Sequence, residues 1–490
     1  MFLLSIAYAY GWLFAVMSAA MLLPVPFALT FEESNVIGAF VVTSAILAFA
    51  GGALIFALKG TKLRTGRRLN LFVLCTIWLI MPLFAALPLY ISGQPDGLVA
   101  AYFEAVSGFT TTGATVFVDL ADVPRSILVW RSILQWLGGF TTLLALGVLI
   151  GPLTGQERLG AELRQIGHSK HSIAQDVATA IRTILPVYGG LTLACFALLV
   201  FAAIPPFDAF CLALSTLSTG GFMPRSGTIA LYGSSAAELI LALFMFLGAV
   251  SLLWVRAILQ FRWGMLREIR EPVSIGLIIL FLGVLLTVPL LINSPETGVR
   301  SVYRSLTLGL ATAASFVSTS GFAVSDRTQD AIPYMFVLVI CLVGGGRFST
   351  AGGLKYFRVA AMFRQSGREL RFLLFPHLVR PSRYGKESRD ISILQTLWSN
   401  FVVIVLVLIA LTAILSTGGV PLSAGLLAAI SSVSNIGPAY SFLPVAEIAS
   451  APPFGEMGSS AQLALCGGMM LGRVEGLALL SLMNFAYWRS

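Results

Sequence analysis

Hydrophobic runs of two lengths alternate along this chain. The long runs can cross a bilayer, for which a helix needs about 20 apolar residues, and the short runs cannot. Two long runs come first, at residues 3–29 and 36–58. One order then recurs four times: a long run, a short run, a polar loop and a second long run. This periodicity predicts two N-terminal spans followed by four copies of one structural unit.

The long runs are predicted to be transmembrane helices, and the short runs half-helices that enter the membrane and return. In the four units the long runs cover residues 70–92 and 126–150, 183–204 and 236–259, 273–292 and a segment from 332, and 392–416 and 460–487. The short runs cover 98–106, 207–214, 302–314 and 421–431. The predicted fold class is an all-α integral membrane protein, with four span–pore helix–filter loop–span units around a central pore and two extra N-terminal spans. The expected domain boundaries are 1–68, 69–181, 182–271, 272–390 and 391–490.

The polar loop of each unit is rich in glycine and hydroxyl side chains. The first reads SGFTTTGAT at residues 107–115, and its counterparts lie at 215–222, 315–322 and 432–438. Within a bilayer, non-helical backbone survives only where protein buries it or where it lines a water-filled cavity. One such loop alone would be read as an external linker. Four in register, each behind a run too short to span, predict the lining of a pore.

A pore lined in this way is suited to cations. A cation must exchange its hydration shell for protein oxygens, and rings of backbone carbonyls supported by hydroxyls provide them. Glycine, which recurs at 113, 220, 321 and 437, permits the positive φ angles that turn successive carbonyls toward one axis. The C-terminal end of each half-helix, the negative end of its dipole, would face the pore.

Composition and charge agree with a multispan membrane protein. The chain is 57% hydrophobic and 11% charged, with a mean hydropathy of +0.90, whereas soluble domains carry about 25% charged residues. The basic loop at 59–68 is expected to be cytoplasmic by the positive-inside rule, and the N-terminus with it. Most of the net charge of +9 lies in such linkers, where orientation and contact with anionic membrane lipids explain it. A nucleic-acid partner is therefore not expected.

The first segment lacks a basic n-region and a cleavage site, so it is expected to be a retained span.

Five motifs in this order resemble the Trk/Ktr/HKT potassium transporter superfamily, and most closely its bacterial TrkH-type subunit. They are SGFTTTGAT at 107–115, QWLGG at 135–139, STAGGLK at 349–355, NIGP at 435–438 and GRVE at 472–475. The resemblance covers nearly the whole chain, including the two N-terminal spans. It implies potassium uptake across a bacterial inner membrane, down the electrochemical gradient, with K⁺ as the transported ion and no bound cofactor.

The resemblance also implies roles for individual loop residues. Glycine in all four loops favours potassium, since serine at the first position is associated with sodium-preferring plant members. The selectivity filter would consist of Thr111, Thr112, Gly113, Thr219, Gly220, Ser320, Gly321, Asn435, Ile436 and Gly437. Potassium would bind at Thr112, Gly113, Thr219, Gly220, Ser320, Gly321, Ile436 and Gly437.

Below the filter, the resemblance implies a gate made of an intramembrane loop and one arginine. The loop interrupts the segment from 332 at residues 344–353, and the gate residues would be Gly344, Gly345, Gly346, Arg347, Phe348, Gly352, Gly353 and Arg473. Arg473 lies inside the last predicted span, where a charge is costly and points to function, and it would act as an electrostatic barrier. The family usually has small residues where this chain has Arg347 and Phe348. These two would tighten the gate or replace one of its contacts.

Partners follow from the same resemblance. It implies a homodimer of the membrane subunit and a cytosolic nucleotide-binding regulatory subunit of the TrkA type, docked on the basic linkers. The chain has no Walker A motif and no glycine-rich dinucleotide fingerprint after a strand. Nucleotide sensing would therefore belong to the partner.

Two other functions stay open from the sequence. One is a weakly selective or sodium-permeable cation transporter, because the loops offer shorter filter stretches than the TVGYG sequence of potassium channels. The other is a multispan enzyme acting on lipids, which would need a cluster of acids, a nucleophile with a base, or a metal site. The histidines lie in charged linkers and the cysteines are scattered in apolar runs, so no such cluster is expected. Asp119, Asp122 and Asp326 follow loops at the expected outer mouth, where they would concentrate cations.

Overall fold

The computed structural model describes residues 2–61, 67–146, 173–292, 298–374, 390–442 and 451–474. It is helical apart from one short pair of strands, β1 (Val343–Gly344) and β2 (Leu354–Lys355). Among the described residues, seven helices are long and apolar enough to cross a membrane, and eight if one bent pair counts as a span. The predicted all-helical membrane fold is therefore confirmed. The ends of the spans predicted at 126–150 and 460–487, all three histidines and most of the basic linkers lie outside the described residues.

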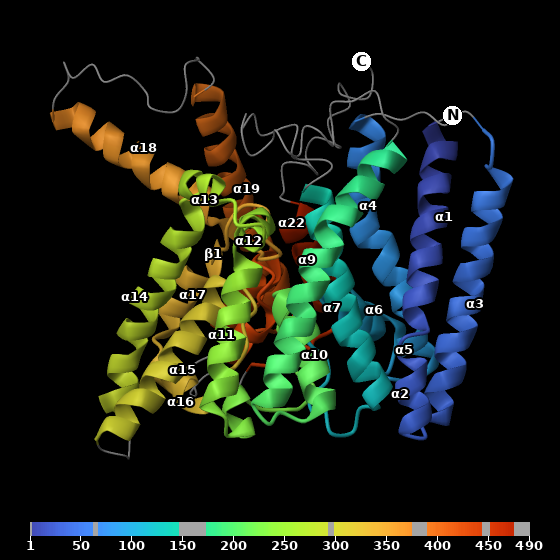
Figure 1. The fold of residues 1–490 in the computed structure, drawn as a ribbon, viewed down its shortest axis with the longest axis horizontal. Coiled ribbons are helices and arrows are strands. Elements are labelled where there is room, and N and C mark those ends of the chain that lie inside the picture. The colour runs from blue at the N-terminus through green and yellow to red at the C-terminus, as the bar shows by residue number, and fades with distance from the viewer. Residues whose placement is uncertain are drawn as a thin grey trace.

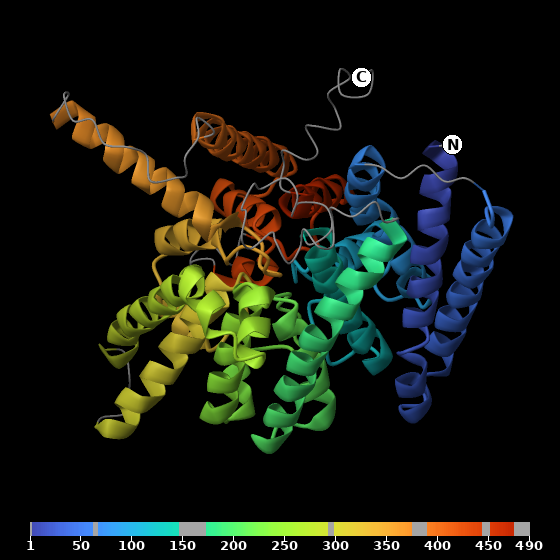
Figure 2. The ribbon, with the colours of Figure 1, turned by 45° about the horizontal axis from the view of Figure 1, so that its top comes forward.

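The first two spans form an antiparallel pair at one edge of the molecule (Figures 1 and 2). They are α1 (Phe2–Met21) and α3 (Ser34–Ala57), joined by α2 (Val25–Thr30). Gly11 and Gly51 let the two backbones approach, because a Cβ on Gly51 would lie 2.8 Å from the carbonyl oxygen of Gly11. Farther along, the hydroxyls of Ser18 and Ser44 lie 3.0 Å apart and each donates to the other's backbone carbonyl. In lipid, helices commonly associate through small residues that allow close packing and through hydroxyls that form hydrogen bonds between them.

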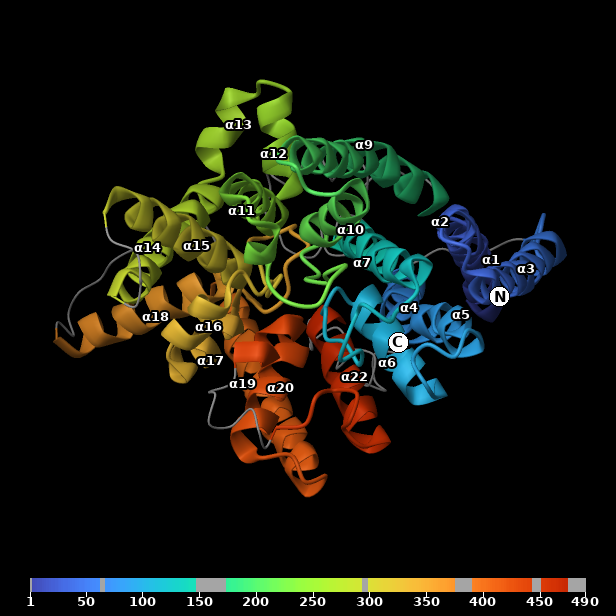
Figure 3. The same cartoon turned by 90° about the horizontal axis from the view of Figure 1, so that it is seen from below.

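The four units follow one another around a common centre (Figure 3). The first unit contains α4 (Arg67–Ala85), α5 (Leu87–Ile91), α6 (Leu98–Phe109) and α7 (Arg125–Ala145). The second contains α9 (Ile173–Phe201), α10 (Pro206–Leu217), η3 (Ile229–Tyr232), α11 (Ser235–Ala249), α12 (Leu252–Leu259) and α13 (Trp263–Glu268). The third contains α14 (Glu271–Ile292), α15 (Val299–Val317), α16 (Asp326–Ala331), α17 (Tyr334–Leu342), the two strands and α18 (Tyr356–Leu374). The fourth contains α19 (Asp390–Thr417), α20 (Leu422–Val433), η4 (Gly437–Phe442) and α22 (Ser459–Val474).

The half-helices predicted from the short runs are α6, α10, α15 and α20. Three of them have 12 residues, and α15 has 19. Each lies inside the bundle, so that its C-terminal half is buried. A 12-residue helix is about 18 Å long, well short of the hydrocarbon thickness, so α6, α10 and α20 are too short to cross a membrane.

The span predicted at 236–259 is broken in its second half. The structure has two helices there, α11 and α12, which meet at 109°. The break has a physical cause in the third unit. The N–H of Gly346 donates to the carbonyl of Ala249 at 2.8 Å, and the N–H of Leu252 donates to the carbonyl of Phe348 at 3.3 Å. Backbone groups freed at the break are therefore satisfied by a neighbouring loop, as burial in a membrane requires.

Candidate functional site

The four half-helices end with the same backbone turn. Each is capped by a hydroxyl residue in helical conformation: Thr110, Ser218, Ser318 or Ser434. The next residue in every case is left-handed, with φ of 54° at Thr111, 56° at Thr219, 60° at Thr319 and 52° at Asn435. Such a conformation costs a non-glycine residue energy and persists only where its surroundings enforce it. Four matching turns in one chain indicate that the four loops (residues 110–115, 218–222, 318–322 and 434–438, the polar loops) are structural equivalents.

This turn corrects the register of the second loop. Two residues after the left-handed position stand Gly113, Gly221, Gly321 and Gly437. The first three have φ of 81°, 80° and 69°. The counterpart of Gly113 is thus Gly221, and the sequence-based choice of Gly220 is one residue early. Two adjacent glycines made the register ambiguous in the sequence, and only the backbone angles resolve it.

The polar loops touch one another in chain order and close into a ring. A Cβ on Gly113 would overlap the carbonyl oxygen of Gly220, and a Cβ on Gly221 would overlap that of Ser320. A Cβ on Gly321 would lie 2.8 Å from Cγ1 of Ile436. The fourth loop returns to the first, because the N–H of Gly437 donates to the carbonyl of Thr112 at 2.6 Å. Glycine is required here by close approach as well as by φ.

Asn435 and Pro438 reinforce the ring from the fourth loop. The Asn435 amide donates to the Thr112 hydroxyl and to the Met469 carbonyl, both at 2.9 Å. The ring of Pro438 lies 2.9 to 3.2 Å from the positions that a Cβ on Gly113, Gly221 or Gly321 would occupy. Pro438 therefore contacts the other three polar loops. The sequence placed it in a motif without predicting this contact.

A glycine-rich loop (residues 344–353) packs against the ends of three half-helices. Its two ends are held together by the parallel pair of β1 and β2. The Thr350 hydroxyl lies 3.1 Å from the Leu217 carbonyl and 3.3 Å from the Thr219 hydroxyl. The N–H of Gly352 donates to the Thr319 hydroxyl at 2.7 Å, and a Cβ on Gly352 would overlap the Ser434 carbonyl. This loop thus contacts the second, third and fourth polar loops at their left-handed turns.

Arg473 completes this contact on the side of the first unit. Its Nε donates to the carbonyl of Thr110 at 2.6 Å, and its Nη1 donates to the carbonyl of Thr350 at 2.7 Å. The side chain comes from α22 and is 9% exposed. The guanidinium therefore ties the end of the first half-helix to the glycine-rich loop.

A second buried cation, Lys355, lies at the end of the glycine-rich loop. Its ammonium donates to the carbonyl of Ala351 at 2.5 Å and lies 3.3 Å from that of Ser349. Arg473, Lys355, Ala351 and Gly352 line a small cavity together with Trp78 and Thr142. Both cations point their donors at backbone carbonyls, the groups that would otherwise coordinate a permeating cation.

Arg347 and Phe348 lie on the far side of this loop. The guanidinium of Arg347 lies 3.9 Å from the Glu271 carboxylate and 4.0 Å from the centre of the Phe357 ring. The backbone N–H of Arg347 also donates to the Glu271 carboxylate at 3.0 Å. Phe348 adopts φ of 52°, and its carbonyl accepts from Leu252. Both residues therefore attach the loop to α14, α18 and α12.

The three acidic residues expected near the outer mouth are all exposed. Asp119 accepts a hydrogen bond from the N–H of Ala121 at 3.0 Å and from the Ser226 hydroxyl at 2.8 Å. These bonds, the first above all, hold the pKa of Asp119 below its usual range. Asp119 therefore stays ionised when the pH falls to mildly acidic values. Among the described residues, no three histidine, cysteine or acidic side chains gather as a metal site would require.

Known proteins similar to this chain form a consistent set. The family profile TrkH, described as a cation transport protein, matches residues 37–486. The Trk system potassium uptake protein TrkH of Salmonella typhimurium LT2 is 30% identical over 497 residues, covering 98% of each chain. TrkG of Escherichia coli K12 is 28% identical over 487 residues, covering 98% of this chain and 97% of that one. The crystal structure of the potassium transporter TrkH from Vibrio parahaemolyticus superposes with a TM-score of 0.84 at 27% identity and covers both chains completely.

Proposed function

This chain belongs to the TrkH family of cation transport proteins, and we propose that it is the ion-translocating subunit of a bacterial potassium uptake system. It is a multi-pass membrane transport protein and not an enzyme. The observation that carries the proposal is the closed ring of four equivalent loops, each at the C-terminal end of a buried half-helix. The matched relatives are named for potassium uptake, which supports K⁺ as the ion.

The proposed selectivity filter is the ring itself. Carbonyls of the four loops would replace the hydration shell of K⁺, and the half-helix dipoles would favour a cation at their negative ends. The filter residues are those predicted from the sequence, with Gly221 taking the place equivalent to Gly113 and with Thr319 and Pro438 added. No acidic side chain is needed, because the carbonyl dipoles supply the negative potential.

The proposed gate is the contact between the ring and the glycine-rich loop. An ion that passed the filter would meet Thr350, Gly352 and the Arg473 guanidinium, all in contact with the turns that end the half-helices. Opening would require Arg473 to release Thr110 or Thr350. The membrane potential supplies about 2.3 kcal/mol per charge per 100 mV for uptake once the path is open.

Replacement of Arg473 tests the gate. We expect Arg473→Ala to raise basal Rb⁺ uptake into proteoliposomes severalfold under a K⁺ gradient, because the guanidinium no longer joins Thr110 to Thr350. Arg371→Ala is the matched control, since Arg371 is an exposed cation in the last turn of α18. Unchanged or lower uptake by a folded Arg473→Ala protein, with the control active, would contradict the barrier role.

A sodium-permeable transporter remains the second candidate, on one specific observation. The residue before the glycine differs in all four loops, being Thr112, Gly220, Ser320 and Ile436. A ring of unlike residues departs from fourfold symmetry and is expected to select less sharply than four identical loops. Growth of a potassium-requiring strain distinguishes the two. Rescue by this chain on limiting K⁺ supports potassium uptake, and rescue only with added Na⁺ overturns it.

The proposed assembly follows the family. We infer a homodimer in the inner membrane, with the N-terminus cytoplasmic because the basic loop at 59–68 lies one hairpin away. A cytosolic nucleotide-binding subunit of the TrkA type would act on the side where α18 extends directly from the glycine-rich loop (Figure 1). Co-purification of this chain with such a subunit, with and without nucleotide, tests the partner.

A further inference from the structure

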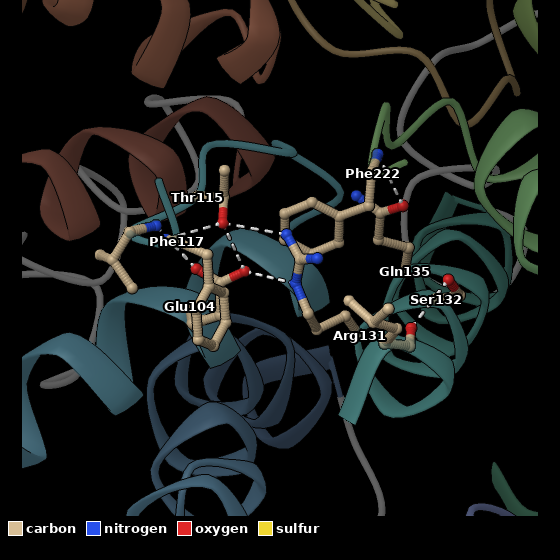
Figure 4. A network of polar contacts seen from close by, with 9 residues as sticks. Glu104, Thr115, Phe117, Arg131, Ser132, Gln135 and Phe222 are labelled. Atoms are coloured by element: carbon tan, nitrogen blue, oxygen red, sulfur yellow. Dashed lines mark hydrogen bonds and ion pairs between the residues drawn. The ribbon is translucent and has the colours of Figure 1, made fainter. Parts of the chain in front are cut away.

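A buried cluster of polar side chains lies behind the first two polar loops (Figure 4). Its centre is an ion pair between Glu104 on α6 and Arg131 on α7, with Nε and Oε1 2.6 Å apart. The two side chains are 0% and 2% exposed. A charge pair this deeply buried is costly to desolvate and is weak evidence for stability as such. The function of this ion pair is better inferred from the backbone segments that it contacts.

The pair holds the chain that leaves the first polar loop. The N–H of Val116 donates to Glu104 at 2.9 Å, and the Thr115 hydroxyl lies 3.1 Å from the same carboxylate. Arg131 donates to the Thr115 hydroxyl at 3.0 Å. Thr115 and Val116 follow Gly113 by two and three residues. The path of the backbone just after the ring glycine is thus fixed by two charged groups at once.

The same side of α7 holds the second polar loop. Arg131 lies over the ring of Phe222, 4.1 Å from its centre, and Phe222 directly follows Gly221. One turn along α7, the side-chain amide oxygen of Gln135 accepts a hydrogen bond from the backbone N–H of Phe222 at 3.3 Å. A Cβ on Gly220 would overlap the Gln135 side chain, so Gln135 also packs directly behind that loop. Residues four apart lie on one helix face, so α7 presents both to the gap between the two loops.

We propose that Glu104, Arg131 and Gln135 are positioning residues that set the spacing between the first and second polar loops, and thereby the discrimination between K⁺ and Na⁺. This inference rests on the proposed function and deepens it. None of the three touches the ion. They act through Thr115 and Val116, which follow Gly113, and through Phe222, which follows Gly221.

The test compares selectivity with stability. Glu104→Gln, Arg131→Lys and Phe222→Leu are reconstituted in proteoliposomes, and Rb⁺ and ²²Na⁺ uptake are measured in parallel with the melting temperature. We expect each change to lower the Rb⁺/Na⁺ ratio severalfold. Arg131→Lys should have the smallest effect, because lysine keeps the positive charge. It loses only the second guanidinium nitrogen, which donates to Thr115. If a single replacement fails to fold, Glu104→Gln with Arg131→Gln removes both charges together.

The matched control is a second ion pair of similar length. Glu238 on α11 and Arg304 on α15 lie 2.7 Å apart, and the Glu238 side chain is 0% exposed. Arg304 also donates to Ser235, and none of these residues belongs to a polar loop. Glu238→Gln should lower the melting temperature and leave the ratio unchanged. Equal ratios in the Glu104, Arg131 and wild-type proteins would overturn the inference, whereas loss of all uptake in the wild type would instead refute the proposed function.

Discussion

At the scale of single residues, two kinds of group shape the candidate site: glycines that allow close contact, and buried cations that donate to backbone carbonyls. Gly113, Gly221 and Gly437 permit loop-to-loop contacts that no side chain would fit. Arg473 donates to carbonyls of two separate units. A hydrogen bond from a charged donor contributes about 1.5–3 kcal/mol, so contacts of this strength are enough to hold the proposed gate shut and weak enough to be broken.

Two glycines of α22 give a prediction at this scale. Gly472 packs so closely on α20 that a Cβ would overlap the Val433 carbonyl, whereas a Cβ on Gly467 would meet nothing within 4 Å. Gly472→Ala is expected to lower the melting temperature and alter uptake, because α22 must move and carries Arg473 with it. Gly467→Ala is expected to be neutral or to stabilise by up to about 1 kcal/mol through helix propensity. Equal melting temperatures would show that the close contact is not maintained.

At the scale of elements, the break between α11 and α12 and the glycine-rich loop form one interlocked piece. Each donates a backbone hydrogen bond to the other, through Gly346 to Ala249 and Leu252 to Phe348. The loop is also attached to α14 through Arg347 and Glu271. A displacement of α12, α14 or α18 would therefore act on the loop directly, and through it on the proposed gate.

The Glu271 contact yields the prediction for these elements. Glu271→Gln should loosen the loop and raise basal Rb⁺ uptake, and Arg347→Ala should do the same. If the two act through one contact, the double variant should equal the stronger single variant rather than the sum. Glu369→Gln, at an exposed carboxylate on α18, serves as the control. Fully additive effects would assign Arg347 and Glu271 separate roles.

At the scale of the whole molecule, the pseudo-fourfold arrangement lets one chain build a ring that other proteins assemble from several subunits. The helices surround it in chain order, and the N-terminal pair α1 and α3 lies outside it (Figure 3). The topology predicted from the sequence places the basic linkers on one face, and the exposed Asp119, Asp122 and Asp326, in segments that follow the polar loops, on the other. Such acids raise the local concentration of cations through a long-range potential.

This division of charge predicts an effect that depends on ionic strength. Replacing Asp119, Asp122 and Asp326 together by Asn should lower Rb⁺ uptake at low salt, with little change at about 0.5 M salt, where screening is strong. Because the lowered pKa keeps Asp119 ionised, its share of the wild-type effect should persist as the pH falls from 7 to 5 and fade only once the pH passes through that pKa. An equal loss of uptake at both salt concentrations would contradict the electrostatic explanation.

Much of the fold was predictable because its signals are local. Span length, the half-helices and the four polar loops all follow from runs of apolar and small residues. The places where prediction failed depend on contacts between distant segments. Gly248 precedes the break at residues 250–251, but a single glycine does not by itself end a helix; the break forms where Gly346 and Phe348 supply alternative partners. Gly221 could not be told from Gly220 without the backbone angles of the neighbouring loops.

The sequence by itself determined that this is a membrane protein with four loops of glycine and hydroxyl residues, each after a short apolar run. The reason is that the length and composition of an apolar run are local properties of the chain. Tertiary structure alone decided that the loops close into a ring and that Arg473 reaches Thr110, 363 residues away. It also decided that the Glu104–Arg131 ion pair contacts the segments that follow the first and second polar loops, at Val116 and Phe222. Such contacts depend on how the four units pack around one centre, and no local pattern encodes that packing.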